Sequence, residues 1–212
     1  MKKSGRYDIS HLPEAQFEPG SRKLVIRNRL GIKNKREIDK AETAALARAT
    51  DALVRTYDQD HKFSAKDICY FHRIWLQEIY EWAGEYRNVN VSKDGFPFAA
   101  ANCINASMEQ FDQLLNRHTP TRFEKEAVVT SLAETHVELM LIHPFREGNG
   151  RAGRVLAILM ALQAGLPFLD FSSIRGKKKQ EYFAAVRAGM DKNYEPMKKI
   201  FSEVIEKSLR AS

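Results

Sequence analysis

The sequence is poor in cysteine, with only Cys69 and Cys103 among 212 residues. So few thiols exclude a disulfide framework and a metal site of four cysteines, and the histidines and cysteines show no metal-ligand spacing. Long apolar runs are also missing, since none approaches the roughly 18 residues of a transmembrane helix. The basic segment Met1–Arg6 lacks the apolar stretch that would follow it in a secretory signal. These absences predict a cytoplasmic protein with no membrane partner.

The overall composition is that of a globular domain, with 43% hydrophobic and 29% charged residues. The net charge of +7 arises in residues 1–36, which hold ten Lys or Arg and three Asp or Glu. The remainder of the chain holds 24 residues of each sign. We therefore expect a basic N-terminal arm, residues 1–24, ahead of a neutral body. Such an arm either binds nucleic acid or lies on an acidic surface, and the second interpretation is preferred.

Apolar residues recur at helical spacing through most of the chain. The pattern predicts an all-α fold of seven to eight helices. One strand-like stretch interrupts it, where Asp94 and Gly95 separate two short β-type runs and indicate a β-hairpin. Ser64 is expected to cap one helix and Gly84 to end it. The expected helices cover residues 35–57, 64–84, 104–115, 123–142, 151–164, 178–190 and 195–209.

The residues with the clearest chemistry lie between His143 and Arg154. Pro144 ends the preceding apolar helix, so His143 is expected at a buried helix end beside a loop. An imidazole titrates near neutrality and suits a general base. The following helix begins near Arg151, and the free N–H groups of its first turn favour an anion such as phosphate. Glu147 adds a carboxylate, which is best explained by a magnesium ion shared with phosphate oxygens.

Glycine and arginine complete this loop. Gly148 and Gly150 permit close backbone approach and positive φ angles. Arg151 and Arg154 lie one helical turn apart, so both can face the same anion. The composition therefore predicts a loop that holds a polyphosphate with magnesium next to a histidine base. The matching reaction is transfer of a phosphorus-centred group to a protonated nucleophile. No other histidine is assigned a role in this site.

Residues 143–154 resemble the signature of the Fic (filamentation induced by cAMP) family, HPFx[DE]GNGRxxR, and match every fixed position of it. Further segments are similar to the same family. Residues 71–75 and 79–84 resemble the helix before its flap, and residues 87–93 resemble the flap strand. Residues 28–32 resemble a common N-terminal segment of the family. The similarity therefore extends well beyond the signature loop.

The resemblance covers roughly residues 25–205 and implies a Fic domain over residues 25–212, with a core at about 65–192. It implies a protein adenylyltransferase that uses ATP with magnesium. Such an enzyme transfers AMP to a Tyr, Thr or Ser hydroxyl of a target protein. His143 corresponds to the base that takes the hydroxyl proton, and Glu147 to the acid that binds magnesium.

The nucleotide-binding roles of the family also transfer to positions in this sequence. By the resemblance, Gly148, Asn149 and Gly150 surround the α- and β-phosphates. Arg151 would contact the β-phosphate and Arg154 the γ-phosphate. The implied nucleotide-binding residues are Lys93, Asp94, Gly148, Asn149, Gly150, Arg151, Arg154 and, on the adenine side, Tyr194.

Two protein partners are implied as well. The hairpin Ser92–Phe98 resembles the flap that aligns a target segment by strand addition. A separate small antitoxin would supply a glutamate that competes for Arg154, as in bacterial Fic toxins of toxin–antitoxin pairs. Ser202–Glu206 is a less favoured, self-inhibitory alternative, because Lys207 stands where the family's [ST]xxxE[GN] motif has Gly or Asn. That segment also has the apolar spacing of a final core helix.

Two other functions stay open at this point. A Doc-like protein kinase, or another nucleotidyl or phosphoryl transferase, would use the same site. Doc-like members depart from the motif in the anion hole, whereas Gly148, Asn149 and Gly150 keep it, which favours AMP transfer. A non-enzymatic nucleic-acid-binding protein that uses the basic arm is a distant third, because the motif is intact.

Overall fold

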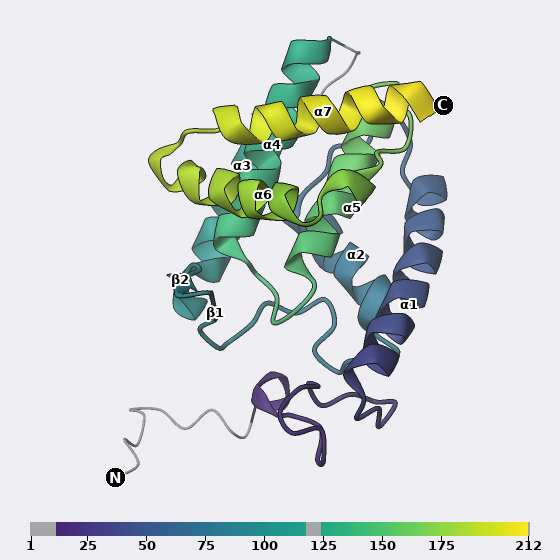
Figure 1. The fold of residues 1–212 in the computed structure, drawn as a ribbon, viewed down its shortest axis with the longest axis vertical. Helices are drawn as coiled ribbons and strands as arrows, with labels where there is room; N and C mark the ends of the chain where they lie inside the picture. Colours follow the sequence, from purple (N-terminus) through teal and green to yellow (C-terminus); the bar gives the residue numbers. More distant parts are fainter. Residues whose placement is uncertain (1–11, 118–123, 212) are drawn as a thin grey trace.

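The computed structural model describes residues 12–117 and 124–211, which form a helical bundle with one short hairpin (Figure 1). This described part contains seven α-helices, so the predicted all-α class is confirmed. None of these helices is long and apolar enough to cross a bilayer. Strand β1 (Ser92–Lys93) pairs antiparallel with β2 (Phe96–Pro97). The helices are α1 (Lys35–Thr56), α2 (Ala65–Leu76), α3 (Ile104–Arg117), α4 (Lys125–Ile142), α5 (Asn149–Gln163), α6 (Lys177–Ala188) and α7 (Glu195–Ala211).

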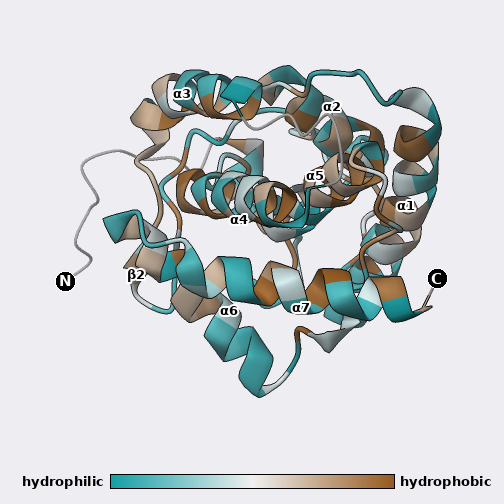
Figure 2. Cartoon of the chain, turned by 90° about the horizontal axis from the view of Figure 1, so that it is seen from above, coloured by the Kyte–Doolittle hydropathy of each residue, from teal (hydrophilic) through white to brown (hydrophobic). Residues whose placement is uncertain are grey.

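Helices α4 and α5 form the centre of the bundle. Seen from above, they occupy the middle, and the other five helices surround them (Figure 2). Helix α4 has buried side chains at most positions from Val128 to Ile142, and α5 from Ala152 to Ala161. Helices with apolar residues on all sides are expected at the interior of a bundle. The loop that joins α4 to α5 therefore starts and ends on two rigid, buried elements.

The helix predicted over residues 64–84 is wrong at its C-terminal end. Helix α2 ends at Leu76, and the chain then turns until Gly84, whose φ is 85°. The amide of Gly84 donates to Nδ1 of His72 at 2.8 Å. A straight helix rises 1.5 Å per residue, which would place residue 84 about 18 Å along the axis from His72. The buried hydrogen bond to His72 therefore replaces two further helical turns.

A second hydrophobic cluster attaches the N-terminal part of the chain to α1 and α2. Val25 belongs to it, and the amide of Arg29 donates to the carbonyl oxygen of Ile79 at 2.8 Å. Residues that precede α1 thus pack against the body instead of extending away from it. The buried members of the cluster are Val25, Ile38, Ala49, Trp75, Leu76, Ile79, Tyr80, Trp82 and Ala83.

Part of the expected basic arm also contacts the body. The side chain of Glu14 is buried and accepts from the amide of Asn88 at 2.8 Å. The carbonyl oxygen of Glu14 accepts from Nε of Arg146, also at 2.8 Å. Residues 1–11 lie outside the described part of the chain, so the arm of residues 1–24 and its boundary stay a prediction.

Candidate active site

His143 lies where α4 ends and the loop to α5 begins. Its backbone is left-handed, with φ 52° and ψ 59°, and its amide donates to the carbonyl oxygen of Leu139. The imidazole stacks on Phe98, with 3.7 Å between ring centroids and 11° between planes. Nδ1 is 3.2 Å from the carbonyl oxygen of Met140, which can only accept. Nδ1 therefore carries the proton, and Nε2 keeps a lone pair.

The protonation state of His143 follows from its surroundings. Burial lowers the pKa of His143 to about 4, and the cations Arg87 and Lys93 act in the same direction. The hydrogen bond to Met140 and the charge of Glu147 act against this shift. The imidazole is therefore neutral at physiological pH, which is the form that a general base requires.

Arg87 fixes the backbone around His143 from inside the protein, with 1% of the residue exposed. Nε donates to the carbonyl oxygen of His143 at 2.8 Å, and Nη2 donates to that of Ile142 at 3.3 Å. Nη1 donates to Val89 and Nη2 to Ala99, both at 2.6 Å. One guanidinium thus connects the C-terminal end of α4 with the chain on both sides of the hairpin.

The loop between α4 and α5 is held by side chains from within and from α2. Asn149 accepts from the amide of Phe145 and donates to its carbonyl oxygen, both at 2.8 Å. His72 stacks on Phe145 at 3.9 Å, and its Nε2 lies 3.0 Å from the carbonyl oxygen of Glu147. Because Nδ1 of His72 accepts from Gly84, Nε2 carries the proton and donates to Glu147. These contacts give the loop one rigid shape.

Gly148 allows this loop to pass close to α2. Its φ is 88°, and a Cβ atom at this position would lie 2.7 Å from Cζ3 of Trp75. Only glycine fits such a position without strain. Helix α5 begins directly afterwards at Asn149. The amides and the dipole at the start of α5 favour an anion at this place.

The two signature arginines project from the first turns of α5. Nη1 of Arg151 is 2.6 Å from a carboxylate oxygen of Glu42, and the guanidinium lies 4.5 Å from the ring of Trp75. Arg154 is 5.8 Å from the ring of Phe171. Its Nε is buried and has no hydrogen-bond partner among the described residues. Arg154 also lines an open cavity, where its guanidinium can donate to an anion.

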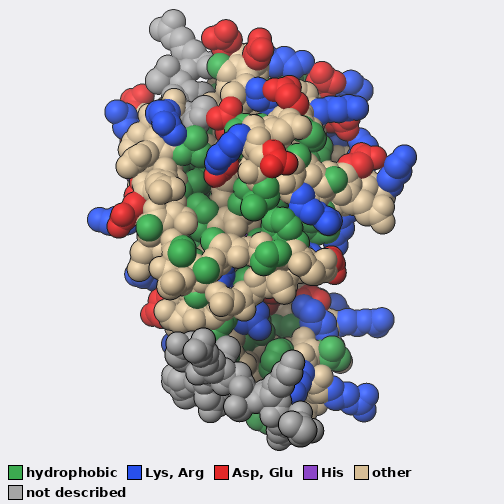
Figure 3. Space-filling model, turned by 90° about the vertical axis from the view of Figure 1, so that its left-hand side faces the viewer, with side chains coloured by type: hydrophobic (Ala, Val, Ile, Leu, Met, Phe, Trp, Pro, Cys, Tyr) green, Lys and Arg blue, Asp and Glu red, His purple; other side chains and the backbone are tan. Residues whose placement is uncertain are grey.

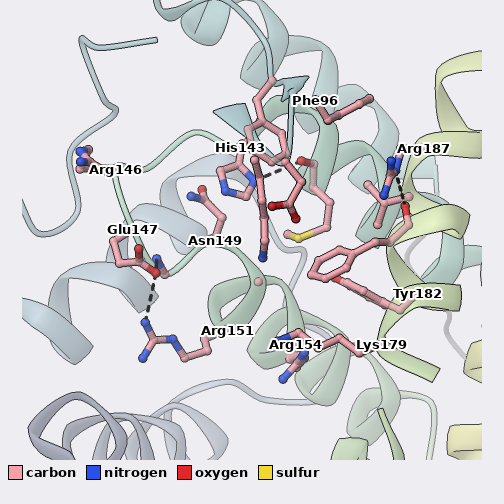
Figure 4. Close-up of a pocket in the computed structure, with 18 residues that line it drawn as sticks. Phe96, His143, Arg146, Glu147, Asn149, Arg151, Arg154, Lys179, Tyr182 and Arg187 are labelled. Atoms are coloured by element: carbon pink, nitrogen blue, oxygen red, sulfur yellow. Dashed lines mark hydrogen bonds and ion pairs between the residues drawn. The ribbon is translucent and has the colours of Figure 1, made fainter. Parts of the chain in front are cut away.

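An open cavity of about 290 Å³ brings these groups together. Figure 4 shows His143 and Asn149 on one side of it, Arg154 on the other, and Arg146 at its edge. The excess of positive charge in the lining suits a polyphosphate. The charged lining residues are Lys93, Arg146, Arg151, Arg154, Lys179 and Arg187, against Asp94 and Glu147.

The hairpin contributes Lys93 and Asp94 to this cavity. Asp94 and Gly95 have φ values of 50° and 78°, as expected for the two central residues of a hairpin turn. Nζ of Lys93 lies 4.2 Å from the ring centroid of Phe183 in α6. The hairpin tip and α6 therefore border the cavity together.

Glu147 is the predicted magnesium ligand, and its side chain is 49% exposed. Oε1 accepts from the amide of Gly148 at 3.1 Å and lies 3.4 Å from Nη2 of Arg151. Within residues 12–117 and 124–211, no group of three or more His, Cys, Asp and Glu could hold a metal. A single carboxylate fits magnesium, because this ion keeps several waters and takes phosphate oxygens from a substrate.

One predicted residue, Tyr194, and one predicted segment, Ser202–Glu206, do not line the cavity. The hydroxyl of Tyr194 donates to Glu138 at 2.6 Å, and Tyr194 is not one of the lining residues. The alternative inhibitory segment Ser202–Glu206 lies in α7. Its Glu206 pairs with Lys125 at 3.0 Å, and none of its residues lines the cavity. The structure therefore does not favour self-inhibition through this segment.

Sequence reasoning missed several residues of the site. His72 and Arg87 position the loop, and no motif spacing connects either of them to it. On α6, the spacing of Lys179, Phe183 and Arg187 at every fourth residue is a signal that they share one face. Nothing in the sequence alone says that this face lines the cavity.

Comparisons with known proteins place the chain in a family. A sequence model of the Fic/DOC family matches residues 62–161. The chain is 34% identical over 157 residues to the probable protein adenylyltransferase y4lH of Sinorhizobium fredii, covering 73% of this chain and 79% of that protein. It is 32% identical over 161 residues to the protein adenylyltransferase VbhT of Bartonella schoenbuchensis. That match covers 76% of this chain and 33% of VbhT, so this chain spans about a third of that relative.

A solved Fic domain has the same fold. It is the N-terminal Fic domain of a putative cell filamentation protein from Bartonella quintana with bound ADP. It matches with a TM-score of 0.71 at 25% identity, over 92% of this chain and 95% of the other. The fold, the signature loop and the extent of the similarity to y4lH all indicate the same family. The chain therefore belongs to the Fic/DOC family and is related to protein adenylyltransferases.

Proposed function

We propose that this chain is a protein adenylyltransferase, which transfers AMP from ATP to a Tyr, Thr or Ser hydroxyl of a target protein. One observation carries the proposal: His143, whose Nδ1 is taken by Met140 and whose Nε2 keeps a lone pair, lines a positively charged cavity that the glycines and arginines of the signature also line. Relatives named protein adenylyltransferase and a related Fic domain with bound ADP support it.

In the proposed reaction, Nε2 of His143 accepts the proton of the target hydroxyl. The hydroxyl oxygen forms a bond to the α-phosphorus, and the bond from that phosphorus to the bridging oxygen of the β-phosphate breaks. Pyrophosphate leaves with negative charge that Arg151 and Arg154 stabilise. The negative phosphates of a bound nucleotide would raise the pKa of His143 from its low value, which makes it a stronger base.

Glu147 is the proposed magnesium ligand. Magnesium would neutralise phosphate charge when bound with the nucleotide. The half-exposed carboxylate of Glu147 has room to bind it. The proposed anion hole consists of Gly148, Asn149 and Gly150, and the contacts of His72 and Asn149 hold its backbone in place before the nucleotide arrives. A prearranged set of donors needs little reorganisation during the reaction.

The target is proposed to dock along the hairpin Ser92–Phe98. Both residues of β1 are exposed, and the amide of Ala99 ties the base of the hairpin to the carbonyl oxygen of Leu141 in α4. Figure 3 views the side of the molecule on which the hairpin lies in Figure 1. Hydrophobic side chains gather across the middle of this face, and charged ones lie around it. An extended target segment suits such a surface.

A role as the toxin of a toxin–antitoxin pair in the cytoplasm is the proposed biological setting. The inhibitor would be a small separate protein whose glutamate pairs with Arg154 and blocks the γ-phosphate position. The position of Arg154 in the lining of the open cavity supports this. Coexpression with a protein bearing an S-x-x-x-E-G helix should suppress transfer, and changing its Glu to Ala should restore it.

Labelled ATP tests the proposed chemistry. The protein is incubated with magnesium, a cell lysate and ATP labelled on either the α- or the γ-phosphate. Label from the α-phosphate on a target supports AMP transfer, whereas label from the γ-phosphate alone indicates a Doc-like kinase. His143→Ala should slow transfer by about 10²–10⁴-fold and leave the Kd for ATP nearly unchanged. His61→Ala, which lies outside the cavity, is the control. Transfer at the wild-type rate by His143→Ala would exclude the assigned base.

A further inference from the structure

Glu42 is a buried carboxylate in the middle of α1, outside the residues 62–161 that the family model matches. The residue is 2% exposed. A charged side chain is rarely buried unless other groups pair with it and donate hydrogen bonds. Oε2 of Glu42 accepts from Nη1 of Arg151, and Oε1 accepts from the hydroxyl of Tyr80, both at 2.6 Å. The two carboxylate oxygens therefore have separate partners.

The same region of α1 also fixes the ring on which Arg151 lies. The backbone carbonyl oxygen of Glu42 accepts from Nε1 of Trp75 at 2.8 Å. The guanidinium of Arg151 lies 4.5 Å from this ring. Glu42 thus holds Arg151 directly through its carboxylate and indirectly through Trp75. The Arg151 side chain is only 29% exposed, so these contacts restrict it to one region.

Two edges of the Arg151 guanidinium are used differently. Nη1 is taken by Glu42, and Nη2 lies 3.4 Å from Glu147 at the cavity (Figure 4). A guanidinium has five N–H donors, so an arginine bound to Glu42 can still donate to an anion. An arginine already held in place loses less side-chain entropy on binding. The ion pair with Glu42 therefore prepares Arg151 for a ligand and does not occupy it fully.

We propose that Glu42 is a positioning residue for Arg151: it holds the guanidinium at the cavity so that it contacts the β-phosphate of the nucleotide. The inference rests on the proposed function, because it takes Arg151 as the β-phosphate ligand. It makes α1 part of the nucleotide site, although α1 lies outside the matched part of the family model. The competing explanation is that Glu42 only attaches α1 to the bundle.

The binding of ADP and AMP separates these explanations, because AMP lacks the β-phosphate. Calorimetry on the full chain measures the Kd for each. Glu42→Leu should raise the Kd for ADP by roughly 5- to 30-fold, the range set by the entropy of one arginine side chain. The Kd for AMP should stay within about twofold of the wild type. Glu42→Asp, which shortens the side chain by one methylene, should raise the Kd for ADP by a smaller factor. This variant tests the proposal if Glu42→Leu does not fold.

Ile38→Ala is the matched control. Ile38 lies one turn before Glu42 on α1 and is 1% exposed, but it does not line the cavity. It should lower the stability of the protein and leave the ratio of the two Kd values unchanged. Arg151→Ala should remove the preference for ADP, and adding Glu42→Leu to it should cause no further loss.

The outcomes are distinguishable. If Arg151→Ala removes the ADP preference and Glu42→Leu does not, or if Glu42→Leu tightens ADP binding, this inference fails while the proposed function stands. If the wild type binds ADP no better than AMP, or Arg151→Ala changes neither Kd, the assigned role of Arg151 in the proposed function fails. If Glu42→Leu and Ile38→Ala change the ratio of the Kd values for ADP and AMP equally, Glu42 has a structural role alone.

Discussion

Replacing Gly148 by alanine should destabilise the protein strongly, for two reasons. The residue has a φ of 88°, and a left-handed backbone costs a residue with a Cβ about 1–2 kcal/mol. The new Cβ would lie 2.7 Å from Cζ3 of Trp75. Trp75 is 2% exposed and packed in the second cluster, so it cannot move aside freely. Overpacking of this kind costs about 1–3 kcal/mol. The expected loss in the free energy of unfolding is therefore about 2–5 kcal/mol.

Gly150 provides a matched control two residues away. It lies within α5, its φ is not positive, and a Cβ there would meet no atom within 4 Å. Alanine is favoured over glycine inside a helix by roughly 0.5–1 kcal/mol. Gly150→Ala should therefore leave the stability unchanged or raise it slightly. Both variants add one methyl group, but Gly148→Ala should lower the free energy of unfolding and Gly150→Ala should not.

Urea unfolding followed by circular dichroism measures both variants. Under two-state behaviour, the shift in midpoint multiplied by the m-value gives the change in free energy. Gly148→Ala should unfold at clearly lower urea than the wild type, and Gly150→Ala should not. If both variants shift equally, or Gly148→Ala matches the wild type, then neither the backbone angle nor the contact with Trp75 limits this position.

The remaining predictions concern pH and the buried arginine. Burial lowers the pKa values of His72, His136 and His143 to about 4. In the unfolded chain the pKa of each histidine is near 6.5, so below about pH 6.5 the unfolded state binds more protons than the folded state. The free energy of unfolding should therefore fall as the pH drops from about 6.5 to 4. At pH 5 the loss should be about 2 kcal/mol per histidine. Urea unfolding at pH 7, 6 and 5 would show this, and a flat profile would contradict it. Arg87→Met should cost on the order of 3 kcal/mol, because it leaves several buried carbonyl groups unpaired. The same urea unfolding assay measures this loss of stability. Arg87→Lys should recover only part of it. Wild-type stability in Arg87→Met would refute the prediction.

The local parts of the fold and site could be predicted from sequence. Helix α1 extends from Lys35 to Thr56, close to the expected 35–57, because its apolar residues repeat at helical spacing. The hairpin turn at Asp94 and Gly95 follows from two residues that tolerate positive φ. The signature residues are contiguous, so one loop and one helix start bring them together. In each case the relevant contacts join residues near one another in the chain.

The supporting contacts could not be predicted, because they join distant parts of the chain. His72 reaches Glu147 across 75 residues, Arg87 reaches His143 across 56, and Glu42 reaches Arg151 across 109. No spacing rule covers such distances. The same limit explains the error at the end of α2. The helical pattern continued past Leu76, but the hydrogen bond between His72 and Gly84 turns the chain back, and that bond depends on tertiary packing.

The stacking of Phe98 on His143 has a consequence for substrate choice. Phe98 follows β2 directly, so the hairpin proposed to receive the target also presses flat against the imidazole ring. If a target strand adds to the hairpin, sliding it by a residue moves its hydroxyl while Nε2 stays in place. Side chains of a strand alternate between its two faces, so every second position points away. Which hydroxyl reacts would then be decided by alignment along the strand more than by whether it belongs to serine, threonine or tyrosine.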